Sequence, residues 1–154
     1  MITISPMDVS DLRQRILRAL DQARTESPAR PADVANRRAE LDAAKRAYEG
    51  FLANTAVPLL KQAQTILKAE GRLFSVHSPV DSARLISDAA PTTFLEFVLD
   101  PSGPRAQVVG RISRGRGKRV TVEERPLSEG KAIQDLGEDD VAAFLVTEIP
   151  RLVL

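Results

Sequence analysis

The feature that most constrains the fold is a change of hydrophobic period near Gly71. Before this glycine, apolar residues recur every three or four positions, as on one face of a helix; after it they alternate with polar residues, as in a strand. No helical crossovers separate the alternating segments, so the strands should be joined by tight turns and pair antiparallel. The pattern predicts an α+β chain, with a helical hairpin or extension in residues 1–71 and an antiparallel sheet plus a C-terminal helix in residues 72–154. We expect the two parts to form one continuous folding unit.

The helical part should contain two helices. The first, residues 6–24, begins at Ser5-Pro6 and carries an apolar stripe of Val9, Leu12, Ile16, Leu17 and Leu20. The second, residues 33–70, ends at Gly71 and should be kinked by Pro58, which has no N–H to donate. Its expected apolar stripe is Leu41, Ala44, Tyr48, Leu52, Ala56, Leu59, Ala63 and Ile66. Antiparallel pairing of the helices predicts a hairpin, and the same two helices are the expected surface for self-association.

The second part should form a four- to five-stranded antiparallel meander. The expected strands are residues 73–77, 83–87, 93–99, 107–112 and 119–124. Strand 93–99 is largely apolar on both faces, which predicts a central strand covered on both sides except near Glu96. A last helix should begin at Gly137, carry acidic residues in its first turn, and end or kink at Pro150. Its expected buried stripe is Val141, Phe144, Leu145 and Ile149.

Composition excludes several classes of site. Cysteine is absent, which excludes disulfides, thiol nucleophiles and cysteine-ligated zinc or iron–sulfur clusters. The net charge is +1, so an electrostatic partner would have to recognise a local patch. No apolar run is long enough to span a bilayer, and residues 1–6 lack the basic and apolar regions with which a signal sequence begins, so we expect a cytoplasmic protein without membrane contact.

A basic segment is the sharpest local signal. Its loop, residues 113–118, is rich in arginine and glycine and is expected to be exposed at the tip of a β-hairpin. Such a tip can follow a phosphate backbone or bind an acidic protein. Hairpin tips are more often charged for solubility and to block edge pairing, or neutralised by acids of their own chain, here Glu123, Glu124 or residues 138–140. The candidate residues for binding nucleic acid or another anion are Arg111, Arg114, Arg116, Lys118 and Arg119.

Other constellations do not predict a catalytic, metal or cofactor site. The glycines of the basic loop do not have the spacing of a phosphate-binding P-loop. His77 is the only histidine, and no nucleophile-elbow motif accompanies it. Adjacent residues of a strand point to opposite faces, so Glu123 and Glu124 should not act together. Asp139 and Asp140 are explained by their place at a helix N-terminus.

The leading hypothesis is therefore a non-enzymatic interaction or assembly protein. It would self-associate through its helices and bind a macromolecular partner with its sheet or with the basic hairpin. The alternative is a nucleic-acid-binding protein that uses the basic hairpin. A further alternative is an enzyme whose pocket the sequence does not reveal.

Overall fold

The computed structural model describes residues 9–26 and 31–154, which divide into two compact units, residues 1–40 and 41–154. The first unit contains helix α1 (Val9–Glu26) and the start of helix α2 (Pro31–Phe51). The predicted helix start at Ser5-Pro6 lies outside the described residues, as do residues 27–30 between the two predicted helices. The two units are described separately, so antiparallel packing of the two predicted helices remains a prediction.

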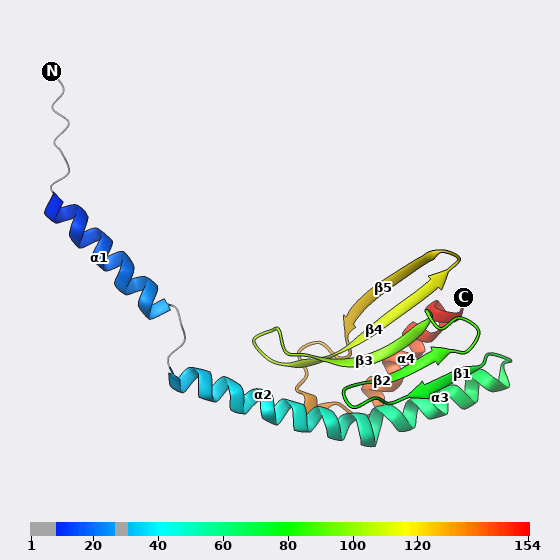
Figure 1. Cartoon of the computed structure of the whole chain (residues 1–154). Helices are drawn as coiled ribbons and strands as arrows, with labels where there is room; N and C mark the ends of the chain where they lie inside the picture. The colour runs from blue at the N-terminus through cyan, green and yellow to red at the C-terminus, as the bar shows by residue number, and fades with distance from the viewer. Residues whose placement is uncertain (1–8, 27–30) are drawn as a thin grey trace. The chain divides into compact units, whose positions relative to one another are not determined.

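The predicted long helix is present, and it bends where Pro58 interrupts it. Helix α2 continues through a π-helical turn (Leu52–Ala56) into helix α3 (Val57–Ala69), and the bend is visible in Figure 1. Pro58 cannot donate the hydrogen bond that the Asn54 carbonyl would accept in an α-helix. A π-turn shifts hydrogen bonding to the fifth residue along, and the Val57 N–H accordingly donates to the Leu52 carbonyl.

The π-turn also changes which residues of α3 are buried. The predicted stripe is confirmed at Tyr48, Leu52, Ala56 and Ala63, but Ile66 is 64% exposed. Leu60 and Leu67 occupy the core instead, one position later than the predicted Leu59 and Ile66. The prediction was wrong here because a π-turn contains more residues than an α-turn and therefore rotates the following helix face.

Gly71 ends α3 in a Schellman motif. Its φ of 78° lies in the left-handed region, where glycine carries no steric penalty. The Arg72 N–H donates to the Leu67 carbonyl at 2.8 Å and the Gly71 N–H donates to the Lys68 carbonyl at 3.0 Å. The predicted boundary between helix and sheet is confirmed at this residue.

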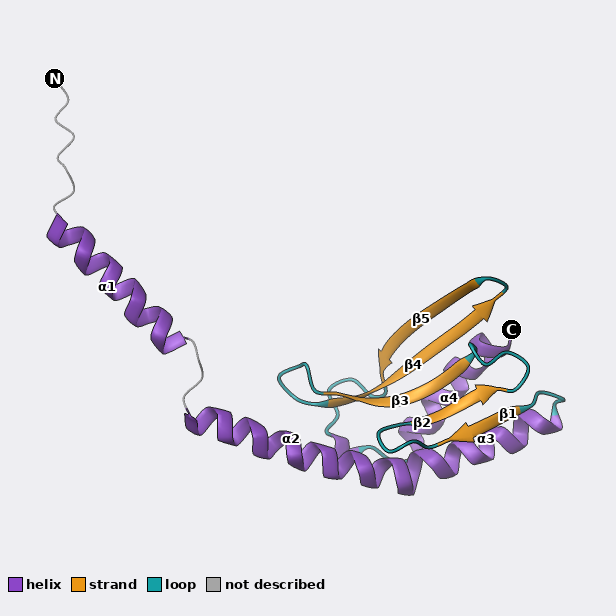
Figure 2. Ribbon diagram, in the orientation of Figure 1, coloured by secondary structure: helices purple, strands orange, loops and turns teal. Residues whose placement is uncertain are grey.

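The sheet is a five-stranded antiparallel meander in the order β1-β2-β3-β4-β5 (Figure 2). Its strands are β1 (Phe74–His77), β2 (Ala83–Ser87), β3 (Phe94–Asp100), β4 (Gln107–Arg116) and β5 (Arg119–Pro126). A short 3₁₀ turn (Ile133–Asp135) then leads into helix α4 (Glu138–Val153). The predicted α+β class and the central place of β3 are confirmed.

The core lies between one face of this sheet and helices α3 and α4. Leu85, Leu95 and Phe97 point to that face and are fully buried. The expectation that β3 is covered on both sides except near Glu96 is wrong. Within residues 41–154 no helix lies on the opposite face of the sheet. Among the β3 side chains on that face, Glu96 is the most deeply buried, at 3% exposure.

Helix α4 differs from the prediction in two respects. Pro150 lies inside the helix, which continues to Val153 and so does not end at the proline. The buried face includes Val141, Phe144 and Leu145 as predicted, together with Glu148 and Leu152. None of the helices in residues 9–26 and 31–154 combines the length and apolar character that crossing a bilayer requires.

Candidate functional site

The basic hairpin is longer and its loop shorter than predicted. Strand β4 extends to Arg116, and only Gly117 and Lys118 form the turn to β5. Gly117 has a φ of 62°, which suits the first central position of a two-residue hairpin turn. The expectation of an exposed loop over residues 113–118 is therefore wrong for Ser113, which is buried in β4 and donates to the Thr92 carbonyl at 2.6 Å.

The structure does not bring the five predicted cations into one patch. Arg111 lies in the middle of strand β4 and is paired with acids of its own chain. Arg116 donates to the Leu154 carbonyl at 2.8 Å. Within residues 9–26 and 31–154, Arg114, Lys118 and Arg119 form no ion pair. Of the five predicted cations, Arg114, Lys118 and Arg119 near the turn are therefore the uncommitted ones, meaning that they form no ion pair within the described residues.

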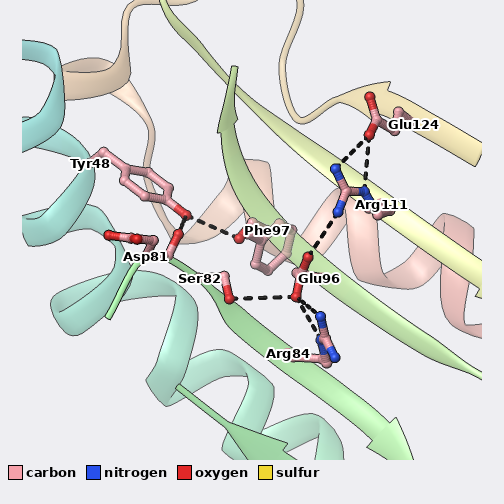
Figure 3. Close-up of polar contacts among 8 residues, drawn as sticks. All are labelled: Tyr48, Asp81, Ser82, Arg84, Glu96, Phe97, Arg111 and Glu124. Carbon is pink, nitrogen blue, oxygen red and sulfur yellow. Dashed lines mark hydrogen bonds and ion pairs between the residues drawn. The ribbon is translucent and has the colours of Figure 1, made fainter. Parts of the chain in front are cut away.

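A row of alternating charges crosses the face of the sheet that faces away from α3 and α4. The strand register places Arg84 of β2 opposite Glu96 of β3, Glu96 opposite Arg111 of β4, and Arg111 opposite Glu124 of β5. Directly opposed side chains lie on the same face of an antiparallel sheet, so Glu96 meets an arginine on either side, and Glu124 at the end of the row meets Arg111. Figure 3 shows the contacts of these four residues, which belong to β2, β3, β4 and β5.

Glu96 is the centre of this row. Arg84 approaches its Oε2 with two nitrogens, at 2.6 Å from Nε and 2.5 Å from the terminal nitrogen. Arg111 lies 3.5 Å from Oε1, and the Ser82 hydroxyl lies 3.5 Å from Oε2. A buried carboxylate is tolerated when it is paired and hydrogen-bonded, and both conditions are met here. The cluster therefore has the features of a structural ion-pair network.

Tyr48 ties the long helix to the sheet next to this network. Its hydroxyl oxygen lies 2.6 Å from the Asp81 carbonyl oxygen and 3.0 Å from the Phe97 carbonyl oxygen, and its one hydrogen is donated between them (Figure 3). Burial raises the pKa of Tyr48, and the negative charges of Glu96 and Asp81 raise it further. The phenol is thus held as a hydrogen-bond donor.

A second buried acid lies on the helix-covered face. Glu148 of α4 is 2% exposed and pairs with Arg125 of β5, which also lies 2.5 Å from Glu123. The Oε2 atom of Glu148 has no hydrogen-bond partner within the described part of the chain. Glu123 and Glu124 do point to opposite faces, since Glu124 pairs with Arg111 on the other side.

Arg84, Arg125 and Glu148 are not among the predicted site residues. Arg84 and Arg125 stand where strand alternation allows a polar residue, so the sequence gives no signal for them; Glu148 alone is a charge where the apolar period of its helix predicts a core residue, between Leu145 and Leu152. Such a signal marks a buried charge but not its partner. The partners come from other strands and depend on the register.

The remaining candidates have structural surroundings. His77 is exposed at the end of β1, and the neighbouring Ser75 hydroxyl donates to Asp88 at 2.5 Å. Asp140 accepts from the Gly137 N–H at 2.9 Å and pairs with Lys131 at 3.0 Å, and these two contacts lower its pKa. Within the described ranges, no cluster of three or more histidine or acidic side chains could hold a metal ion.

Comparison with known proteins finds no matching family model, no similar curated protein and no similar solved structure.

Proposed function

We propose that this chain is a non-enzymatic assembly protein that pairs with a second copy of itself through α1 and presents its sheet unit to a macromolecular partner. The observation that carries the proposal is the apolar stripe of α1. Leu12, Ile16, Leu17 and Leu20 are each between 45% and 50% exposed, and Val9 is 80% exposed.

The length of α1 supports a role in pairing. An isolated helix of about 18 residues is marginally stable in water, and most helices in proteins are stabilised by packing of their apolar face. The stripe repeats at helical spacing from Val9 to Leu20, along about 17 Å of helix at 1.5 Å per residue. The polar face is not of one sign, since Asp11 and Arg15 form an ion pair at 3.4 Å, so two copies can approach without strong repulsion.

Size-exclusion chromatography with light scattering on the full chain tests this proposal. We expect a mass above that of the monomer, and we expect Ile16→Glu to lower it by placing a charge in the stripe. Arg18→Glu is the matched control, because it introduces the same residue on the opposite side of α1 and should leave the mass unchanged. A wild-type monomer at every concentration, or equal masses for the two variants, would overturn the proposal.

A second candidate is nucleic-acid binding, which the three uncommitted cations near the hairpin turn favour. If Arg114, Lys118 and Arg119 each contact one phosphate of duplex DNA, the log–log salt slope should be about −2.7, at about −0.9 per contact. Mobility-shift titrations of mixed DNA and RNA at two salt concentrations measure it. Absence of any shift at low salt would reject this candidate.

A further inference from the structure

The border strand β5 is exposed along most of its length. Figure 2 shows it at the edge of the sheet, and within residues 41–154 no strand pairs with its outer side. Val120 and Val122 are 53% and 54% exposed on the face that carries Glu124. An unpaired strand edge is a template for pairing with another chain. The opposite border, β1, has only four residues.

The ladder with β4 determines which backbone groups of β5 are free. The Leu127 N–H donates to the Val108 carbonyl at 2.9 Å, so odd-numbered residues from 119 to 127 direct their N–H and C=O groups toward β4. Val120, Val122 and Glu124 then direct theirs outward. Pro126, which has no N–H, falls at an outward position, as expected for a proline on an edge strand.

We propose that β5 pairs antiparallel with β5 of a second copy, with Thr121 opposite the partner's Thr121. In this register Val120 lies opposite the partner's Val122, so two pairs of valines meet through their outward-directed backbone groups. Arg119 lies opposite the partner's Glu123, and Lys118 lies opposite the partner's Glu124. The two cations on β5 and its turn that form no ion pair within the chain thus face acids of the other copy.

Neighbouring registers lack this complementarity. If Val122 is placed opposite the partner's Val122, Arg119 faces the partner's Arg125 and Val120 faces the partner's Glu124. If Glu123 is placed opposite the partner's Glu123, like charges meet at the centre. Like charges directly opposed across an antiparallel pair are destabilising, so these two registers are less favourable than the Thr121-centred one.

This contact is independent of α1 and so does not rest on the proposed function. Each surface is self-complementary and generates a two-fold dimer by itself. A chain that uses both surfaces would form assemblies larger than a dimer, and Ile16→Glu would leave the β5 dimer intact. The β5 experiments are therefore performed in full-length chains that carry Ile16→Glu.

Cysteine cross-linking tests the register directly, because the chain has no cysteine of its own. Thr121 would sit on the two-fold axis in a non-hydrogen-bonded pair with Cα atoms about 4.5 Å apart, within the range of a disulfide. We expect Thr121→Cys to form covalent dimers under mild oxidation faster than Val122→Cys or the exposed control Ser78→Cys. Equal rates for all three variants, or a faster Val122→Cys, would overturn the proposal.

Charge reversal gives a second test that does not require a covalent bond. Lys118→Glu and Glu124→Lys should each lower the dimer fraction measured by sedimentation, and the double variant should restore it. Position 118 in the turn and position 124 on β5 are six residues apart, about 20 Å at about 3.4 Å per residue, so restoration requires contact between copies. Lys61→Glu and Glu129→Lys are matched controls at exposed positions. Failure of the double variant to recover, with each protein shown to be folded by circular dichroism, would reject the pairing.

Discussion

Removing Arg84 should destabilise the protein more than removing the acid it binds. Arg84→Met deletes both close contacts to Glu96 Oε2 and leaves a carboxylate that is 4% exposed, with Arg111 at 3.5 Å as its remaining cation. Removing one partner of a buried ion pair lowers the free energy of unfolding by about 3–5 kcal/mol. We expect a loss of about 3 kcal/mol, because the Arg84 side chain is 36% exposed. In urea this lowers the unfolding midpoint by about 1–2 M for m-values of about 2 kcal/mol/M.

Glu96→Leu should cost about 1 kcal/mol or less, because an apolar residue in place of a buried charge is often neutral. The two arginines are more than one-third exposed and can be hydrated, and Arg111 keeps its contact with Glu124. The double variant Arg84→Met/Glu96→Leu should then be more stable than Arg84→Met alone, because it contains no unpaired buried carboxylate. Urea denaturation followed by circular dichroism, at constant m, measures all three variants. A Glu96→Leu variant as unstable as Arg84→Met would refute the reasoning, because the cost would then lie in the packing of strand β3 and not in an uncompensated charge.

Three further predictions concern single contacts. Because the pKa of Tyr48 is raised in the folded state, the folded protein keeps the phenol proton at a pH where the unfolded chain has lost it. The free energy of unfolding should therefore fall as the pH rises above about 10. Tyr48→Phe should remove this dependence in thermal melts at alkaline pH, and it should lower the free energy of unfolding by about 1–3 kcal/mol at neutral pH. The lowered pKa of Asp140 has the opposite sign, so its contribution is present above about pH 4 and is lost on acidification; Asp140→Asn should cost about 1 kcal/mol at pH 7 and flatten the acid limb of the stability curve. A Cβ at Gly110 would lie 2.1 Å from Phe144 Cζ, so Gly110→Ala should lower the free energy of unfolding by about 3 kcal/mol. Adding Phe144→Leu should recover part of this loss in a double-mutant cycle. Purely additive effects would show that the ring does not pack on the glycine.

Local order along the chain was predictable from the sequence because it depends on neighbouring residues. The change of period at Gly71, the five strands and the acidic start of α4 all follow from patterns within short windows. The burial of Leu60 and Leu67 in α3 was not predictable, because it depends on the π-turn ahead of Pro58, which shifts the phase of the helix that follows. A proline in the sequence predicts an irregularity in the helix, but it does not predict whether that irregularity is a kink or a π-turn.

The candidate site depended on tertiary structure for a different reason. The sequence by itself marked Arg111 as one of five neighbouring cations and Glu96 as a charge in an apolar strand. Only strand register places the two side chains together, and a slip of one residue would turn each to the opposite face. Ion pairs between strands are long-range contacts that a local pattern does not encode. The same register leaves Lys118 and Arg119 uncommitted at the sheet edge, because their positions lie beyond the acids that neutralise Arg111.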